Sequence, residues 1–354
     1  MRCVSRAEGA YRVHRVRRIV RGVVATTMCA IVAACGSGTG AAVRVAIPPG
    51  ATLRIASDSL AKAGVIRFPR LFRVYASVRR SDRGIKSGTY ALHKDAGWGF
   101  VLDALRGGKG IVHVVTIPEG FSLSQIAAAV AAKLKVPADS VMRAASDTAL
   151  LHQLDVPTPT LEGYLFPDTY TFQDGTTARA AVDAMVRRFE QVWKPEWTAR
   201  LDTLHLSRND VMALASIVEK EAKVNEERPV IAAVYLNRLR DGMLLQADPT
   251  VQYALGKHVA RVFYKDLDVD SPYNTYKHKG LPPGPIASPG RASIEAALYP
   301  ANVPYEYFVA FPDGHHEFRA DLKSHEAAKL EARKAWDSLE AKPLARRADS
   351  TRSK

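Results

Sequence analysis

The stretch from Asn209 to Ala222 constrains the fold most, because it combines a helical hydrophobic repeat with two carboxyl groups. Ser207 precedes it as a candidate N-cap, and Asp210 stands three residues later, as in a capping box. Apolar residues recur at helical spacing, at Val211, Leu214, Ala215, Val218 and Ala222. This pattern predicts an amphipathic helix that buries one face.

Glu219 and Glu221 lie on opposite edges of that apolar stripe, each about 80° from its centre at helical spacing. Met212 makes the edge of Glu219 the more apolar one. A carboxyl group at such an edge is partly desolvated, and desolvation raises the pKa of a carboxyl group toward the range of a general acid. A pair of ordinary solvated glutamates would give the same letters, so the segments around the helix must decide between the two interpretations.

Those segments closely resemble the endolytic murein transglycosylase family (YceG-like, MltG-type). The resemblance covers roughly residues 45 to 337 and is carried by five motifs in the family's order: Ala215–Glu221 (ASIVEKE), Tyr235–Leu239 (YLNRL), Leu245–Gly256 (LQADPTVQYALG), Ser271–Tyr276 (SPYNTY) and Gly280–Ile286 (GLPPGPI). Each motif is weak alone, but together they are specific.

The resemblance implies an endolytic lytic transglycosylase. Such an enzyme cleaves the bond between N-acetylmuramic acid and N-acetylglucosamine within nascent peptidoglycan strands, leaves 1,6-anhydromuramoyl ends and terminates glycan elongation. One carboxyl group suffices, and Glu219 is matched to the family's catalytic glutamate, with a supporting role for Glu221. Substrate contacts are predicted from the matching segments at Gln246, Asp248, Thr250, Asn274 and Tyr276. Neither a cofactor nor a metal is expected.

Three other interpretations remain open. A hydrolytic muramidase would use Asp248 as a second carboxylate and would release reducing ends. A non-catalytic scaffold would only bind peptidoglycan. A metalloenzyme would use His315, His316 and His325, although their spacing matches no known zinc motif.

The first 44 residues predict export and attachment to a membrane. Basic residues up to Arg21 precede a short apolar run, and Val32–Cys35 resembles a lipoprotein cleavage site, which makes Cys35 a candidate for lipidation. Residues 1–35 are therefore predicted to be a signal peptide or a membrane anchor, followed by a flexible tether at 36–44. Either form places the catalytic region on the periplasmic, extracytoplasmic side, at the inner membrane or as a lipoprotein.

The rest of the chain predicts an α+β protein. Val45–Ala56 and Val115–Ile126 share a strand-turn-helix pattern, which indicates a repeat; the resemblance implies that the second copy is a LysM-like glycan-binding unit. We expect a small α+β unit at 45–114, the LysM-like unit with a connecting helix at 115–200, a mixed α+β catalytic domain at 201–340 and a polar mobile tail at 341–354. Residues 161–172 are predicted to be a core strand that buries Phe166 and Tyr170.

Charge and cysteine content limit the partners. The formal net charge is +14, but the sequence contains no recognised nucleic-acid module, so an anionic wall or membrane is favoured over nucleic acid. All three cysteines lie within the first 35 residues, so the remainder of the chain has no cysteine for a disulfide or a metal site. The expected partners are glycan strands, the membrane and peptidoglycan synthases.

Overall fold

The computed structural model describes residues 41–256 and 262–352. The chain forms two compact units, one that ends at His113 and one that begins at Val114. The predicted signal peptide or anchor at 1–35, including Cys35, lies outside the described residues. Within the described ranges, no helix is both long and apolar enough to cross a bilayer.

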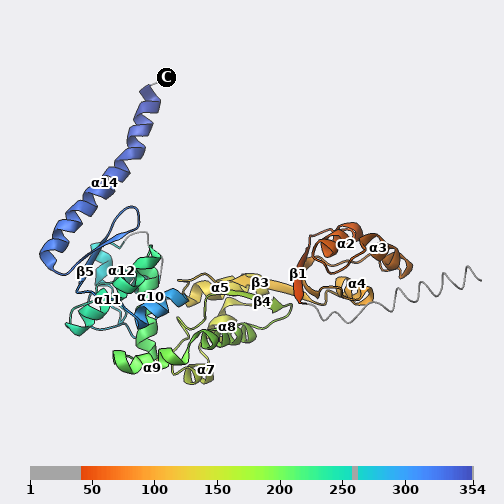
Figure 1. Ribbon diagram of the computed structural model, residues 1–354, viewed down its shortest axis with the longest axis horizontal. Helices are drawn as coiled ribbons and strands as arrows, with labels where there is room; N and C mark the ends of the chain where they lie inside the picture. Colours follow the sequence, from red (N-terminus) through yellow and green to blue (C-terminus); the bar gives the residue numbers. More distant parts are fainter. Residues whose placement is uncertain (1–40, 257–261, 353–354) are drawn as a thin grey trace, which may run out of the picture. The chain divides into compact units, whose positions relative to one another are not determined.

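The first unit packs three helices against an antiparallel strand pair (Figure 1). Strand β1 pairs with β2 from Ala42 opposite His93 to Ile47 opposite Gly88. The predicted tether at 36–44 is therefore too long, because residues 42–44 already belong to the sheet. The elements are β1 (Ala42–Ile47), α2 (Leu53–Lys62), α3 (Pro69–Val78), β2 (Gly88–His93), α4 (Trp98–Gly107) and β3 (Ile111–Thr116).

The core of the first unit follows from the helical repeats of α2, α3 and α4. Its fully buried side chains include Leu60, Phe72, Tyr90, Leu102 and Leu105. The phenol of Tyr90 donates to the carbonyl oxygen of Lys86 over 2.7 Å, which gives this buried hydroxyl a partner. Thr52 caps α2, and Gly108 ends α4 in the left-handed conformation, as the turn residues predict.

The second unit begins with helices that follow β3 and return to β4, and the four strands form one sheet in the order β1-β2-β3-β4. Helix α5 starts with a capping box, whose members are Ser122 and Gln125. The elements up to the catalytic region are α5 (Leu123–Leu134), α6 (Ala138–Ala144), α7 (Thr148–Gln153), β4 (Thr169–Gln173), α8 (Ala178–Val192) and α9 (Pro195–Leu204).

The helix predicted at 209–222 is α10. It is the central helix of the second unit, and α11, α12 and α13 pack against it. Figure 1 shows α10, α11 and α12 beside one another. Every residue from Val211 to Val218 is buried. The remaining elements are α10 (Arg208–Glu221), the 3₁₀ turn η1 (Asn225–Glu227), α11 (Arg228–Arg240), α12 (Asp248–Ala254), the 3₁₀ turn η2 (Tyr264–Asp268), α13 (Arg291–Leu298), β5 (Tyr307–Ala310), β6 (His316–Arg319) and α14 (Leu322–Arg352).

Three expectations need correction. Only 169–172 of the segment 161–172 belongs to a strand, β4, because a turn at 162–164 interrupts it; Phe166 is buried, but Tyr170 is only half-buried. The predicted mobile tail at 341–354 is helical through Arg352, because it is rich in good helix formers. The boundary drawn at 200/201 falls inside α9, which packs against α13. The mixed α+β class itself is confirmed.

Candidate active site

Helix α10 is fixed at its start and in its middle. Its N-terminus has the predicted capping box, in which the Asp210 amide donates to Ser207 Oγ over 3.1 Å and the Ser207 amide donates to Asp210 Oδ2 over 2.9 Å. In the middle, the buried hydroxyl of Ser216 accepts from the amide of Ile286 over 3.0 Å. These contacts hold the C-terminal turn, with its two glutamates, against the loop that precedes α13.

The carboxyl group of Glu219 is surrounded by hydrogen-bond donors and a cation. Its Oε2 accepts from the amide of Gly290 over 3.0 Å and from the hydroxyl of Ser293 over 2.8 Å, at the start of α13. Its Oε1 lies 3.5 Å from the guanidinium of Arg228, and only 8% of the Glu219 side chain is exposed. The predicted desolvation is present, but the helix N-terminus, the hydroxyl and the cation all stabilise the charged carboxylate.

Glu119 is a site neighbour that the sequence argument did not identify. A side chain at Gly290 would begin 1.9 Å from Glu119 Oε1, so the carboxyl group occupies the space that this glycine leaves open. Burial of the carboxyl group and the negative charge of Glu219 raise the pKa of Glu119, and Arg228 opposes the shift. The position of Glu119 in the Pro-Glu-Gly turn after β3 gave no signal that it would meet α10.

Glu221 lies in a different environment, with fewer hydrogen-bond donors than Glu219 has. The phenol of Tyr235, itself buried, donates to Glu221 Oε1 over 3.0 Å. The pKa of Glu221 is raised to about 7, mainly by burial and also by the negative charge of Asp248, while the Tyr235 hydrogen bond and Lys223 oppose the shift. A carboxyl group with this pKa is present in both protonation states near neutral pH, as a group that must donate and then accept a proton requires.

Asp248 and Tyr276, both predicted as substrate contacts, meet each other beside Glu221. The Tyr276 hydroxyl donates to Asp248 Oδ1 over 2.6 Å, and burial with the charge of Asp248 raises the pKa of Tyr276. Asp248 does not cap α12, since the residue at the cap is Ala247 and no side chain bonds there. Three of the predicted residues are therefore brought together by electrostatic interaction or hydrogen bonding.

The other predicted contacts have structural bonds. Thr250 is fully buried and bonds to the carbonyl oxygen of Ala247 and to the hydroxyl of Thr275. Asn274 is fully buried and donates to the carbonyl oxygens of Leu267 and Val269, each over 2.8 Å. These two side chains position the loops. Gln246 is exposed, with a φ of 52° in the left-handed region, in the irregular segment that leads into α12.

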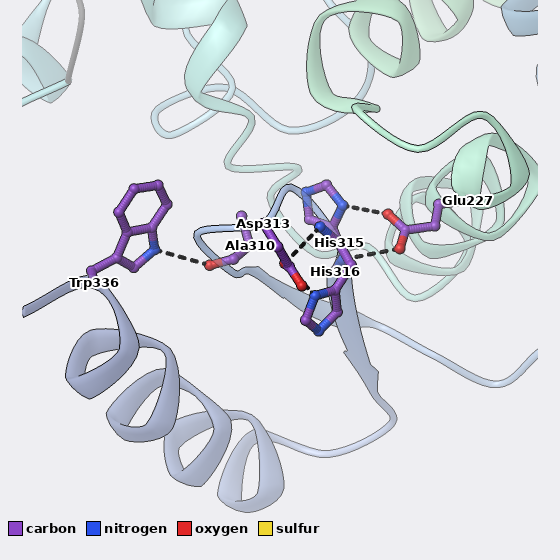
Figure 2. A network of polar contacts seen from close by, with 6 residues as sticks. All are labelled: Glu227, Ala310, Asp313, His315, His316 and Trp336. Atoms are coloured by element: carbon purple, nitrogen blue, oxygen red, sulfur yellow. Dashed lines mark hydrogen bonds and ion pairs between the residues drawn. The ribbon is translucent and has the colours of Figure 1, made fainter. Parts of the chain in front are cut away.

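The β5–β6 hairpin is fastened to the start of α11 through a histidine (Figure 2). His316 Nδ1 lies 2.7 Å from Glu227 Oε2, and the His316 amide donates to Glu227 Oε1 over 3.0 Å. His315 bonds instead to Asp313, and His325 stacks on Tyr307. The three histidines therefore do not converge, and among the described residues no group of three potential ligands is placed to hold a metal ion.

Glu162 is a further carboxyl group that the sequence did not point to, and it is buried. Its two oxygens accept from the amide of Leu123, at 2.9 and 3.1 Å, at the N-terminus of α5. Burial raises the pKa of Glu162 to about 7, while the Leu123 amide and Tyr253 lower it. Its location in the Leu161-Glu-Gly163 turn, flanked by aromatic residues, is compatible with a structural role in joining α5 to α12.

The fold and these residues define a member of a known family. The YceG-like family model matches residues 45–331, so the chain belongs to the YceG-like family. A protein named endolytic murein transglycosylase from Bacillus subtilis (strain 168) is 38% identical over 310 residues, which cover 81% of this chain and 84% of the relative.

A protein of the same name from Streptococcus pneumoniae (serotype 2, strain D39) is 32% identical over 299 residues; these cover 76% of this chain but only 54% of that longer protein. The crystal structure of a yceG-like protein from Listeria monocytogenes matches with a TM-score of 0.60 and 35% identity. That match covers 81% of this chain and 98% of the Listeria chain.

Proposed function

We propose that this protein is an endolytic lytic transglycosylase that cleaves peptidoglycan glycan strands. The names of its relatives and the family assignment support the activity and the substrate class. The observation that carries the mechanism is the paired environment at the end of α10, where one glutamate is held by donors and the other has a pKa of about 7.

We assign the general acid to Glu221. The protonated carboxyl group gives its proton to the glycosidic oxygen as the bond from C1 of the muramic acid to that oxygen breaks. The resulting carboxylate then accepts the proton of the 6-hydroxyl, whose oxygen forms a bond to C1 and closes the 1,6-anhydro ring. No water is consumed, and the carboxyl group ends in its starting state.

The sequence prediction that Glu219 is the acid stays an untested alternative. All three groups around the Glu219 carboxyl group are donors or cations: the Gly290 amide, the Ser293 hydroxyl and the Arg228 guanidinium. Glu219 instead fits a positioning role, because it ties the end of α10 to α13 and α11. Asp248 and Tyr276 are assigned to substrate contact beside Glu221.

The proposal also includes a glycan-binding unit, attachment to the membrane and partner synthases. β3, the helices α5 and α6, and β4 form the LysM-like glycan-binding unit; support comes from a strand-helix-helix-strand order in which β3 and β4 are neighbours in the sheet. Residues 1–35 attach the protein to the membrane, with the catalytic region on the extracytoplasmic side and synthases as partners. The basic, apolar and cysteine-containing order of that segment supports the attachment.

Product analysis tests the reaction and the acid together. The chain from Gly36 onward is incubated with uncrosslinked glycan strands, and the products are identified by mass spectrometry. Wild type should yield internal fragments with anhydro ends. Glu221→Gln should lower the rate by at least about a hundredfold, which is the contribution of a general acid, and should leave the far-ultraviolet circular dichroism unchanged.

The matched variant is Glu219→Gln, which makes the same substitution two positions earlier on α10. We expect it to reduce stability while retaining clear cleavage. Loss of cleavage in Glu219→Gln alone, with a folded protein, would return the acid role to that residue. Reducing ends in place of anhydro ends would establish a muramidase, and glycan binding without cleavage by wild type would favour a scaffold.

A further inference from the structure

The first unit exposes an apolar stripe along α3 that nothing in the described chain covers. Phe68, Leu71, Val74 and Val78 are 59%, 53%, 61% and 73% exposed. From Leu71 the spacing is i, i+3 and i+7, so these side chains share one face of the helix. Scattered apolar residues on a surface are ordinary, but three along one helix face, next to an exposed Phe68 at the N-cap of that helix, are typical of an interaction site.

The face of α3 opposite the stripe packs into the core of the first unit. Phe72 and Ala76 are fully buried in the core of the first unit, and Phe72 packs edge-on against Trp98 with ring centres 6.0 Å apart. The stripe is therefore not required to hold the helix on the unit. It is an additional apolar face beside the one that already anchors α3.

The flanks of the stripe are strongly basic. The segment 67–83 contains six arginines and one aspartate. Arg67 pairs with Asp95 and Arg73 pairs with Asp58, whereas Arg70 is exposed in the first turn of α3, and Arg80 and Arg83 are exposed in the segment that follows the helix. A helix with an apolar face flanked by arginines is typical of elements that lie in the interface of an anionic bilayer.

The position of the unit in the chain agrees with this partner. Strand β1 begins at Ala42, and the segment predicted to enter or attach to the membrane ends at Cys35. Seven residues span at most about 25 Å when fully extended. A first unit on so short a connection stays within reach of the bilayer surface.

We propose that α3 docks onto the surface of an anionic membrane, with Leu71, Val74 and Val78 inserted among the acyl chains and the arginines at the headgroups. A single lipid chain or a short anchor binds a bilayer only marginally, and a second contact converts that into stable attachment. The inference does not depend on which glutamate is the catalytic acid, and its test contains no glycan, so the two proposals can fail separately.

Flotation with lipid vesicles tests the docking. The chain from Ala41 onward contains every described residue and lacks the predicted anchor. It is mixed with vesicles of phosphatidylglycerol and phosphatidylcholine, or of phosphatidylcholine alone. The wild-type chain should float with the anionic vesicles, and the binding should weaken as salt is added.

Two kinds of variant separate the apolar and the basic contributions. Leu71→Ser with Val74→Ser should lower binding to anionic vesicles by about tenfold, since two inserted side chains are lost. Arg70→Gln should lower it by about fivefold, as expected for one headgroup contact. Leu330→Ser is the matched control, because Leu330 is 62% exposed on α14 and lies outside the stripe; it should float like wild type. Unchanged thermal unfolding shows that the variants remain folded.

Three results would overturn the proposal. The first is wild-type chain that does not float with anionic vesicles, and the second is flotation that the double serine variant leaves unchanged. The third is wild-type chain that elutes as a dimer in gel filtration while the double variant elutes as a monomer. In that case the stripe is an interface between two copies.

Discussion

The phenol of Tyr235 gives the sharpest test of the acid assignment, because it touches one glutamate of α10 and not the other. It donates to Glu221 over 3.0 Å, and burial raises the pKa of Tyr235 well above its ordinary value, so the phenol remains a donor throughout the working pH range. A donor stabilises the charged carboxylate. Tyr235→Phe therefore raises the pKa of Glu221 above its starting value of about 7.

The size of the shift follows from the bond that is lost. A hydrogen bond to a charged group contributes about 1.5–3 kcal/mol, and one pKa unit corresponds to about 1.4 kcal/mol. Because the carboxyl group is only partly buried and water can replace some of the bond, we expect a shift of about one unit. A general acid must be protonated when it acts, so cleavage falls as pH rises through the pKa. The descending limb should move from near 7 to near 8 in the variant.

The assay is the pH dependence of glycan cleavage, measured as anhydro ends formed per minute. Ser293→Ala is the matched control, because it removes a donor from Glu219, at 2.8 Å, and leaves Glu221 untouched. We expect its descending limb to coincide with that of wild type. A limb that moves in Ser293→Ala and stays fixed in Tyr235→Phe would refute the assignment and identify Glu219 as the acid.

Three further perturbations test the surroundings of the site. The pKa of Glu162 is raised to about 7 in the folded protein, above the ordinary 4.5, so the stability that this group contributes is present below pH 4.5 and is lost as pH rises through 7. Between pH 5 and pH 8, the free energy of unfolding in urea should therefore fall for wild type by on the order of 2 kcal/mol more than for Glu162→Gln. An equal change in the two proteins would contradict this. Ser216→Ala leaves the buried Ile286 amide without its acceptor and should reduce the free energy of unfolding by about 1–3 kcal/mol; a loss below about 0.5 kcal/mol would show that the bond is replaced. Gly290→Ala should destabilise wild type by about 1 kcal/mol but a Glu119→Ala background by less, since the new Cβ would meet Glu119 at 1.9 Å; equal losses in chemical unfolding would mean that the two positions do not interact.

Local patterns predicted the elements of the fold closely. The hydrophobic repeat and the capping residues located α10, predicted at 209–222, to within one residue at each end, because this helix is determined by contacts within its own turns. The same reasoning failed for 161–172, where alternating aromatic residues indicated a strand. There, Gly163 adopts a positive φ of 83° and packs against Pro285, a contact far away in the sequence.

The sequence predicted which segments meet at the site, but not the hydrogen-bond donors around each carboxyl group. The motifs identified the segments that meet around α10, and Asp248 and Tyr276 do lie beside Glu221. The number of donors around each carboxyl group was not predictable, since Gly290, Ser293 and Arg228 come from segments 9 to 74 residues away from Glu219 along the chain. Met212 suggested that the edge of Glu219 is apolar, whereas the start of α13 fills that edge with N–H and O–H groups.

The two glutamates thus share one helical turn but acquire different chemistry from the elements that pack on either side of it. On one side, the Gly290 amide, the Ser293 hydroxyl and the Arg228 guanidinium hold the Glu219 carboxyl group and so fix the end of α10. On the other side, Glu221 receives one phenol and faces a second carboxylate, which favours the protonated form. Because the two glutamates are two positions apart on the helix, their side chains point about 200° apart, and a single helix end can supply both a carboxyl group held by several donors and one that acts as an acid near neutral pH. A reaction that uses one carboxyl group first as an acid and then as a base needs a group such as Glu221, and the contacts of Glu219 keep the helix end that carries Glu221 in place.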